Sequence, residues 1–216
     1  MSDNYVITIA DIPESVQYAR RCIRSGAKHG TLIQMFDAVT PRNTNIYEML
    51  KTEGLSPIGF QEKYSRLDNC IAAFLSHYSL WKKAIETQRT TTIYEHDAVV
   101  VNQLNSTIPV NKVCTLGKPS YGNYNTPTFL GTGPLTQKKY FGGAHAYKVT
   151  PEGAEALVAQ AKVFARPTDV FLHVDVFPWL EENYPWKVEV QDSFTTIQNQ
   201  SGCLAKHNYG DDYEII

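Results

Sequence analysis

Residues 91–101 read TTIYEHDAVVV, and we take this stretch to decide the fold, because it predicts a strand that ends in acidic residues. An apolar approach leads into Glu95-His96-Asp97, and small apolar residues follow. Side chains of an extended chain alternate between two faces, so Glu95 and Asp97 are predicted to project to one side while His96 points away. Two carboxylates therefore meet at the end of a predicted strand.

The pair of acids, Glu95 and Asp97, is the first candidate site. Two such groups repel each other where water is scarce, and a divalent cation between them or beside one of them removes the repulsion. Mg²⁺ and Mn²⁺ prefer oxygen ligands and usually share their remaining positions with substrate phosphates. The triplet therefore predicts a site for Mn²⁺ or Mg²⁺ and a diphosphate. Taken alone, it is also typical of a strand end with solvated acids.

The segment before the triplet, residues 69–88, predicts a helix because its apolar residues recur at helical spacing. This helix, the polar turn after it, the apolar strand and the acidic triplet together resemble glycosyltransferase family 25, of the lipooligosaccharide-biosynthesis type. The matching residues are Asn69-Cys70, Ser76-His77, Leu80-Trp81, Ile93 and Glu95-His96-Asp97-Ala98. At two positions the chain departs from the family pattern, with Asn69 in place of a glycine and His96 in place of an acid.

A second stretch, residues 141–150 with the sequence FGGAHAYKVT, is similar to another family motif, a strand that leads into a Gly-Ala helix. The matching residues are Gly143, His145, Ala146, Tyr147, Val149 and Thr150, followed by Pro151-Glu152-Gly153-Ala154. Glycines before the strand allow the backbone to approach a ligand closely. By this resemblance His145 is a candidate contact for the diphosphate or the metal. A core histidine with satisfied hydrogen bonds is the alternative.

Residues 166–172, RPTDVFL, resemble the family element P-x-D-x-[FY]-[LM] and contain Asp169, our first candidate for the catalytic base. A carboxylate at a helix start that faces the ligand edge of a sheet can take a proton from an acceptor hydroxyl. The same carboxylate can instead serve as a helix N-cap, which requires no chemistry. Asp175, in the apolar context HVDVFPWL, is the second candidate for the base.

The resemblance also implies a nucleotide-binding half at the start of the chain, with Phe36-Asp37-Ala38 matching a family element. The candidates for donor binding are Thr8, Ala10, Asp37, Ser76, Glu95, Gly143 and His145. The candidate metal ligands are Asp97, Glu95 and His145. Ordinary residues at strand ends would explain Thr8, Ala10 and Asp37 equally well.

Length and composition predict a single globular domain over residues 1–216. Hydrophobic residues make up 43 % and charged residues 19 %, which is ordinary for a folded domain. The formal net charge of −2 argues against a nucleic-acid-binding protein. The four cysteines stand far apart without a CxxC pair, so we expect neither a zinc site nor a disulfide framework.

The N-terminus, MSDNYVITIAD, carries acid where a signal peptide needs basic residues. No apolar run approaches the roughly 20 residues of a membrane span. We therefore expect no transmembrane segment and a cytoplasmic protein, either bacterial or, if viral, in the cytoplasm of the host.

Local patterns predict strands at 5–10 and 32–38, with a helix from 13 to about 28 that starts at Pro13. Residues 117–136 are rich in glycine, proline, tyrosine, asparagine and threonine, a composition that predicts a mobile surface loop. This loop is either a lid over the donor or a plain surface connection.

By the resemblance, the expected fold is a GT-A-like α/β domain, a mainly parallel sheet flanked by helices. The expected reaction is transfer of a hexosyl or pentosyl group from a nucleotide-diphosphate donor, a UDP-sugar, to a saccharide hydroxyl with inversion. Two alternatives stay open: a phage-type DNA glycosyltransferase acting on hydroxymethylated bases, and a non-catalytic nucleotide-sugar-binding protein. His96 motivates the second alternative, since it replaces an acid. If His96 itself ligates the metal, Mn²⁺ should outperform Mg²⁺.

Overall fold

A seven-stranded sheet with the order β2-β1-β3-β7-β5-β8-β6 runs through the centre of the protein. We describe it from a computed structural model, which covers residues 3–60, 67–104 and 108–191. The strands of this sheet are β1 (Asp3–Thr8), β2 (Gln34–Asp37), β3 (Thr91–Glu95), β5 (Val113–Thr115), β6 (Gly131–Pro134), β7 (Ala146–Val149) and β8 (Glu181–Tyr184). A second sheet pairs β4 (Ala98–Val100) with β9 (Val188–Val190).

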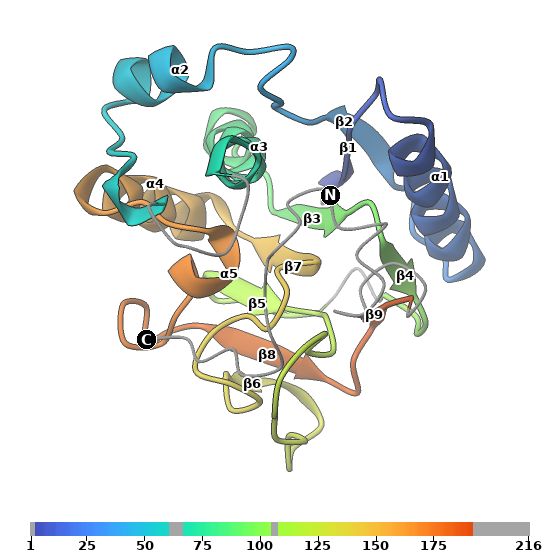
Figure 1. The fold of residues 1–216 in the computed structure, drawn as a ribbon. Coiled ribbons are helices and arrows are strands. Elements are labelled where there is room, and N and C mark those ends of the chain that lie inside the picture. Colours follow the sequence, from blue (N-terminus) through green and yellow to red (C-terminus); the bar gives the residue numbers. More distant parts are fainter. Residues whose placement is uncertain (1–2, 61–66, 105–107, 192–216) are drawn as a thin grey trace.

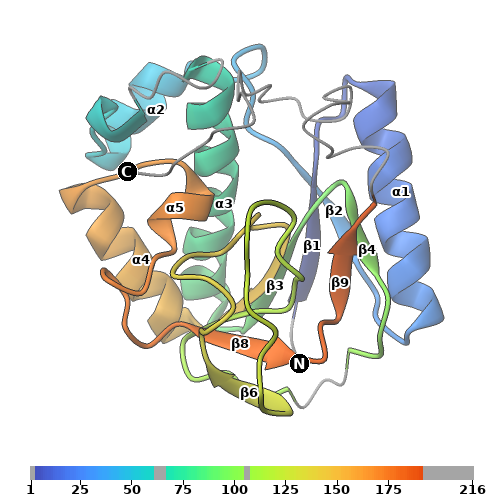
Figure 2. The same ribbon diagram turned by 60° about the horizontal axis from the view of Figure 1, so that its bottom comes forward.

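The helices are α1 (Pro13–Lys28), α2 (Ile46–Glu53), α3 (Leu67–Thr87), α4 (Pro151–Val163) and α5 (Thr168–Phe171), with a 3-10 turn, η1 (Ile58–Phe60). Figure 1 shows α3, α4 and α5 on one side of the central sheet and α1 on the other side, next to the small β4-β9 sheet. The turned view agrees, with α1 separated from the other helices by the strands (Figure 2). These layers confirm the predicted α/β architecture.

The sheet is mostly parallel by strand direction. Strand β1 is parallel to β2 and β3, and β5 is parallel to β8. Strand β7 is antiparallel to both β3 and β5, and β6 is antiparallel to β8. Five of the seven strands therefore point the same way, and their carboxyl ends lie along one edge, where open α/β sheets bind ligands.

Local signals explain where the helices begin. Helix α1 starts at Pro13, which suits a first helical position because its missing N–H would have no partner there. Helix α4 follows Thr150, whose hydroxyl accepts a hydrogen bond from the backbone N–H of Gly153 at 3.1 Å. Both starts lie where the sequence predicts them.

Helix α3 forms the centre of the core because its aromatic residues face the sheet and the neighbouring helices. Trp81 is fully buried, its ring stacks on Phe171 of α5 at 5.6 Å, and it meets Phe74 edge-on at 5.6 Å. Its indole N–H donates to the hydroxyl of Tyr147 at 2.8 Å. The core therefore ties α3 to β7 and to α5, the elements that carry the candidate site.

The predicted strand that ends in Glu95-His96-Asp97 is shorter than expected, and its extended geometry at the acidic residues is wrong. Strand β3 ends at Glu95, His96 and Asp97 form a turn, and β4 begins at Ala98. The chain turns here because β4 leaves the central sheet and pairs with β9. The simple alternation of faces therefore does not apply to Glu95 and Asp97, which are brought together by a turn.

The predicted loop over 117–136 is shorter than expected. Residues 131–134 form β6, an edge strand that pairs with β8. Buried Glu182 of β8 holds the end of this segment, since its carboxylate accepts hydrogen bonds from the backbone of Thr136 at 2.8 Å and of Gln137 at 3.2 Å. The predicted mobility of the rest of the loop stays a prediction.

Within the described ranges, none of the helices combines the length and the apolar character that crossing a membrane requires. The predicted single domain runs to residue 216, and its last part, 192–216, lies outside the described residues.

Candidate active site

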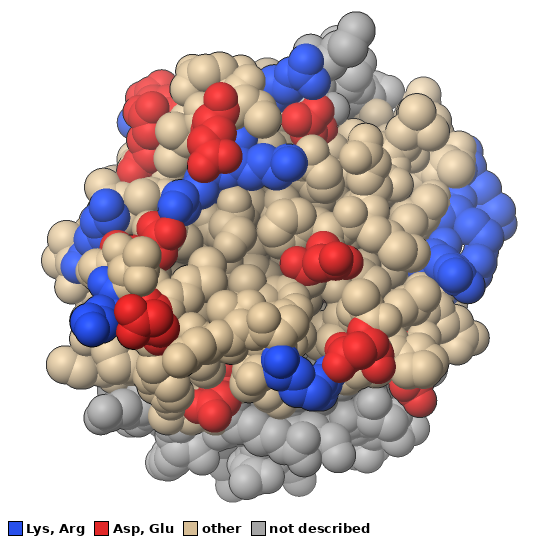
Figure 3. Space-filling model, turned by 90° about the horizontal axis from the view of Figure 1, so that it is seen from above, with Lys and Arg blue, Asp and Glu red and all other residues tan. Residues whose placement is uncertain are grey.

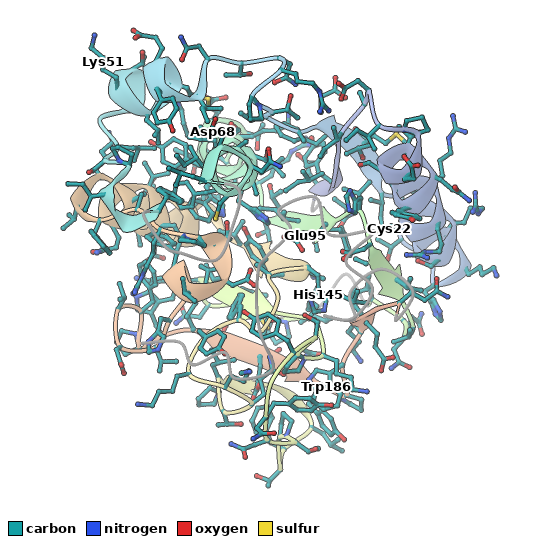
Figure 4. All side chains as sticks on the ribbon, viewed as in Figure 1. Cys22, Lys51, Asp68, Glu95, His145 and Trp186 are labelled. Atoms are coloured by element: carbon teal, nitrogen blue, oxygen red, sulfur yellow. The ribbon has the colours of Figure 1, made fainter. Side chains whose placement is uncertain are left out.

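The candidate site lies at the carboxyl edge of the parallel strands, beside the start of β7. Glu95 is the last residue of β3, and its backbone N–H donates to the carbonyl oxygen of His145 at 3.0 Å. Because β7 is antiparallel to β3, its first residues meet the end of β3 at the same edge. Figure 4 shows Glu95 and His145 near the middle of the view, between α3 and α1. The two sequence motifs therefore converge.

The carboxylate of Glu95 has a raised pKa. Burial raises its pKa from the ordinary value of 4.5 to about 8, the charge of Asp97 adds to the rise, and His96 opposes it. The Glu95 side chain is 37 % exposed. Its Oε1 atom lies 3.4 Å from Nε2 of buried His77. A positive charge next to the Glu95 carboxylate would favour its ionised form.

A chain of buried hydrogen bonds holds His77 against Glu95. The indole N–H of Trp81 donates to the Tyr147 hydroxyl, and that hydroxyl lies 2.9 Å from Nδ1 of His77. Burial lowers the pKa of His77 to about 4, so its ring is neutral at pH 7. Among the described residues, the Tyr147 proton has Nδ1 of His77 as its acceptor, which assigns the ring proton to Nε2. His77 is then the donor to Glu95.

Asp169, on α5, lies close enough to Glu95 and His77 to interact with them electrostatically. Its Oδ1 accepts from the backbone N–H of Ala144 at 3.1 Å, and its Oδ2 accepts from the hydroxyl of Tyr121 at 2.9 Å. Burial first and the charge of Glu95 second raise the pKa of Asp169 to about 6, while these two hydrogen bonds and His77 oppose the rise. A carboxylate that titrates near the working pH suits a general base.

The alternative interpretation of Asp169 as an N-cap is wrong. The N-cap position of α5 is occupied by Pro167, and no side chain makes the capping hydrogen bond. Asp169 instead lies in the first turn, and its carboxylate contacts the segments around Tyr121 and Ala144. The residue therefore connects α5 to the edge of the sheet.

Asp97 has the character expected of a metal ligand. It is 8 % exposed, and its Oδ1 has no hydrogen-bond partner among the described residues. A buried carboxylate oxygen without a donor is costly, and a bound cation would satisfy it. Its backbone carbonyl is held by the guanidinium of Arg21 at 3.2 Å, which fixes the turn.

His145 is buried, and neither ring nitrogen has a hydrogen-bond partner in the part of the chain that the structure describes. Burial lowers its pKa, while Asp97 and the nearby backbone of Gly143 and Val188 oppose the shift. Its ring lies between Gly117 and Gly143, where an added Cβ would collide with it. The two glycines therefore make room for an imidazole next to the acidic turn.

The residues at this edge fit a divalent cation that is shared with a ligand. Over the described ranges, no three His, Cys, Asp or Glu side chains come together as in a metal site made by protein alone. A Mg²⁺ or Mn²⁺ ion bound by one or two carboxylates and by substrate phosphates needs no such cluster. Asp97 and Glu95 match that pattern, with the unpartnered nitrogens of His145 close by.

His96 is held away from this group by α1. Its Nδ1 lies 2.8 Å from the hydroxyl of Ser15, and its ring meets Tyr18 edge-on at 5.8 Å. The Ser15 hydroxyl accepts from the backbone N–H of Ile9, so it donates its own proton to Nδ1. His96 therefore connects the turn to α1 through a hydrogen bond. Its side chain was predicted to point away from Glu95 and Asp97.

The remaining donor candidates lie at the same edge but differ in availability. Thr8 is buried and its hydroxyl donates to the carbonyl of Val6 at 3.0 Å. Ser76 is buried, donating to Ala72 at 2.9 Å and accepting from the N–H of Val39 at 2.9 Å. These bonds give both hydroxyls a structural role.

Three further candidates are accessible. Asp37 is exposed at the end of β2, and Ala10 lines a surface pocket of about 470 Å³ at the start of α1. Asp175 has 69 % of its side chain exposed and lies 3.6 Å from Nδ1 of His173. The structure thus places Asp175 in a different environment from Asp169, beside a second pocket.

Sequence reasoning missed His77, Tyr147 and Lys138, and it suggested Tyr121 as a stacking residue without its hydrogen bond to Asp169. Two of them stood inside the quoted motifs, but neighbouring residues, Ser76 and His145, were selected instead. A usable signal was present for His77, since helical spacing from Phe74 to Trp81 places this polar residue on the apolar face of α3. For Tyr147 and Lys138 the chain carries no comparable local signal.

The mostly parallel sheet flanked by helices is consistent with a single-domain GT-A-like fold. This chain belongs to glycosyltransferase family 25 (LPS biosynthesis protein), whose family model matches residues 1–125. No curated protein matches the chain. The match includes the helix and acidic turn from 69 to 98 and ends before His145 and Asp169.

The raised pKa of Glu95 predicts a pH dependence of stability in metal-free protein. The folded protein holds the Glu95 proton up to pH about 8, whereas the unfolded chain releases it near 4.5. The folded state therefore binds more protons in this window, and the free energy of unfolding should fall as pH rises through it. Asp169, with its pKa raised to about 6, acts in the same direction at lower pH.

Urea unfolding at a series of pH values, with chelator present, measures this slope. Glu95→Gln cannot titrate and should lose the decline between pH 6 and 8, while Glu86→Gln, at an exposed position of α3, should keep the wild-type profile. An unchanged slope in Glu95→Gln would contradict the assignment.

Proposed function

We propose that this protein transfers a sugar, with inversion, from a nucleotide-diphosphate donor to a saccharide hydroxyl at the carboxyl edge of its sheet. The observation that carries the proposal is the position of Glu95 at the end of β3, where its carboxylate interacts with that of Asp97 and with that of Asp169 of α5. Family membership supports the sugar-transfer chemistry. The donor is a UDP-sugar by resemblance, and the cation is Mn²⁺ or Mg²⁺.

In this proposal Asp97 and Glu95 bind the cation, whereas His145, the third predicted ligand, does not form a three-residue cluster with them in the described part of the chain. When bound, the cation neutralises the departing diphosphate. The Oδ1 atom of Asp97 has no competing hydrogen bond among the described residues, so it is free to bind. His77, through its Nε2 proton, holds the Glu95 carboxylate in place. The carboxylates therefore need little rearrangement to accept the ligand.

Asp169 acts as the general base. It takes the proton from the acceptor hydroxyl as the hydroxyl oxygen bonds to the anomeric carbon from the face opposite the nucleotide. The bond between that carbon and the diphosphate oxygen breaks in the same step, and the nucleoside diphosphate leaves. Tyr121 and the backbone of Ala144 orient the Asp169 carboxylate through its two oxygens. Asp175, which is exposed and beside His173, is the less suitable base.

The acceptor in this proposal is a saccharide, and DNA carrying hydroxymethylated bases is the alternative. The face seen in Figure 3 carries lysine and arginine over α1 at one edge, while acidic and basic groups are interleaved elsewhere. The formal net charge of −2 supports a saccharide acceptor, because DNA binding depends on contacts to many phosphates. DNA affinity that falls steeply with salt, together with transfer to modified DNA, would reverse this choice.

The test combines donor binding with turnover. UDP-, GDP- and CMP-sugars are screened for a rise in melting temperature with and without Mn²⁺, since a ligand of the folded state stabilises it. We expect UDP-sugars to stabilise the protein only when Mn²⁺ or Mg²⁺ is present, and donor hydrolysis or transfer to occur under the same conditions. Metal-independent binding without turnover would instead support a non-catalytic nucleotide-sugar-binding protein.

A further inference from the structure

A second pocket includes Val170, the residue after Asp169 on α5, in its lining. It has a volume of about 550 Å³, and its lining includes Lys138, Lys139, Tyr140, Arg166, His173 and Asp175. This volume falls in the range of roughly 300–1,000 Å³ that is typical of small-molecule sites. The pocket can therefore hold one or two sugar residues.

A row of stacked rings connects the candidate base to this pocket. Tyr121 donates its hydroxyl proton to Asp169, and its ring stacks on Tyr140 with the centroids 6.3 Å apart. Tyr140 stacks in turn on His173, at 6.2 Å and an interplanar angle of 13°. Asp169 is therefore connected to the wall of the pocket through Tyr121 and Tyr140, although it is not itself a lining residue.

The pocket carries more positive than negative charge. Its lining includes three cationic side chains, Lys138, Lys139 and Arg166, and one carboxylate, Asp175. None of the three cations forms an ion pair with a carboxylate of the described residues, whereas Asp175 lies next to His173. The positive charge is therefore available for a ligand.

Lys138 is the best positioned of these cations. Its ammonium group lies over the rings of Tyr121 and Tyr140, 5.0 Å and 4.9 Å from their centroids, and donates to the carbonyl of Tyr121 at 2.8 Å. These contacts hold the charge at the junction between Asp169 and the pocket. Two further donor positions of the ammonium group remain for an anion.

We propose that this pocket is the acceptor site and that the acceptor is an acidic saccharide, one that carries a carboxylate or a phosphate group. The inference rests on the proposed function and adds the charge of the acceptor to it. The anionic group contacts Lys138, Lys139 and Arg166, the sugar ring packs on Tyr140, and a hydroxyl of the same molecule reaches Asp169. A pocket of this size, with the rings of Tyr140 and His173 in its wall, suits a saccharide better than a nucleic acid duplex.

The test uses disaccharides matched in size. Digalacturonic acid supplies carboxylates, trehalose 6-phosphate supplies a phosphate, and galactobiose and trehalose are their neutral counterparts; inorganic phosphate and a short DNA duplex complete the set. Calorimetry should show the acidic disaccharides binding roughly tenfold or more tightly than the neutral ones, the effect of one charge-assisted hydrogen bond. The stronger of the two acidic ligands identifies the source of the charge.

Arg166→Gln and Lys139→Gln should each weaken acidic-disaccharide binding by roughly tenfold and leave neutral disaccharides unaffected. Lys51→Gln, on α2 (Figure 4) and not among the residues that line the pocket, is the matched control and should bind like the wild type. Melting temperatures verify that the variants fold.

The inference is overturned if acidic and neutral disaccharides bind equally well. It is also overturned if acidic disaccharides do not bind, while phosphate or DNA binds and Arg166→Gln weakens that binding. In that case metal-dependent turnover of UDP-sugars still leaves the proposed function standing. Conversely, acidic disaccharides bound in this pocket without any donor binding would contradict the proposed function and the acceptor role together. The two failures are thus separable.

Discussion

Replacing Asp97 with asparagine is expected to lower the rate of sugar transfer by about 10³-fold. A cation at a departing diphosphate contributes several kcal/mol of transition-state stabilisation, and each ~1.4 kcal/mol is a factor of ten in rate. Asparagine keeps the size of the side chain and removes the negative charge that binds the cation. The backbone carbonyl at this position, which Arg21 holds, is unaffected.

The measurement is steady-state transfer at increasing Mn²⁺, together with the melting temperature of the variant with and without the UDP-sugar. In Asp97→Asn the metal-dependent stabilisation by the donor should disappear, while the melting temperature of the free protein should change little. Asp68→Asn is the matched control, because Asp68 lies at the start of α3, bonded to Tyr47 and distant from Glu95 in Figure 4. Full activity of Asp97→Asn, with an unchanged metal requirement, would remove Asp97 from the site.

Replacing Asp169 with asparagine is expected to lower kcat by about 10²–10⁴-fold, the usual contribution of a general base. The amide can still accept the hydrogen bond from Ala144 and can donate to the hydroxyl oxygen of Tyr121, so the local structure should persist. The variant loses only the ability to take the acceptor proton. Stabilisation by the donor and the metal should therefore be retained.

This variant also decides between the two candidates for the base. If Asp175→Asn lowered kcat while Asp169→Asn did not, the roles would be reversed, and the exposed pair of Asp175 and His173 would carry the chemistry. Donor hydrolysis in the absence of acceptor gives a second readout, since a base for the acceptor hydroxyl affects transfer to that acceptor directly. A loss of donor binding in Asp169→Asn would show that the residue supports the donor pocket instead.

Much of the fold could be predicted from local patterns. Helix α1 begins at Pro13 as expected, α3 covers nearly the whole predicted segment, and α4 follows Thr150 as the motif implies. Helix starts and apolar periodicity depend on interactions between residues a few positions apart, so they can be read from the chain itself. The family could likewise be recognised from the spacing of residues 69–98.

The local environment of the site residues was harder to predict from the sequence. The strand predicted across Glu95-His96-Asp97 is a turn, because β4 pairs with β9 from the far end of the described chain. The hydrogen bonds of Asp169 go to Tyr121 and Ala144, where the sequence allowed an N-cap. In both cases a partner distant in sequence outweighed the local preference.

The sequence by itself determined that the chain forms an α/β domain of this family, and it identified the acidic turn and the two aspartates that can act as a base. Only the tertiary structure decided that His77 and Tyr147 support Glu95, that Asp169 rather than Asp175 approaches it, and that a cationic pocket lies next to that base. The physical reason is that secondary structure follows from short-range contacts along the chain. The site depends on the order in which strands pair, which places side chains far apart in sequence at one edge of the sheet.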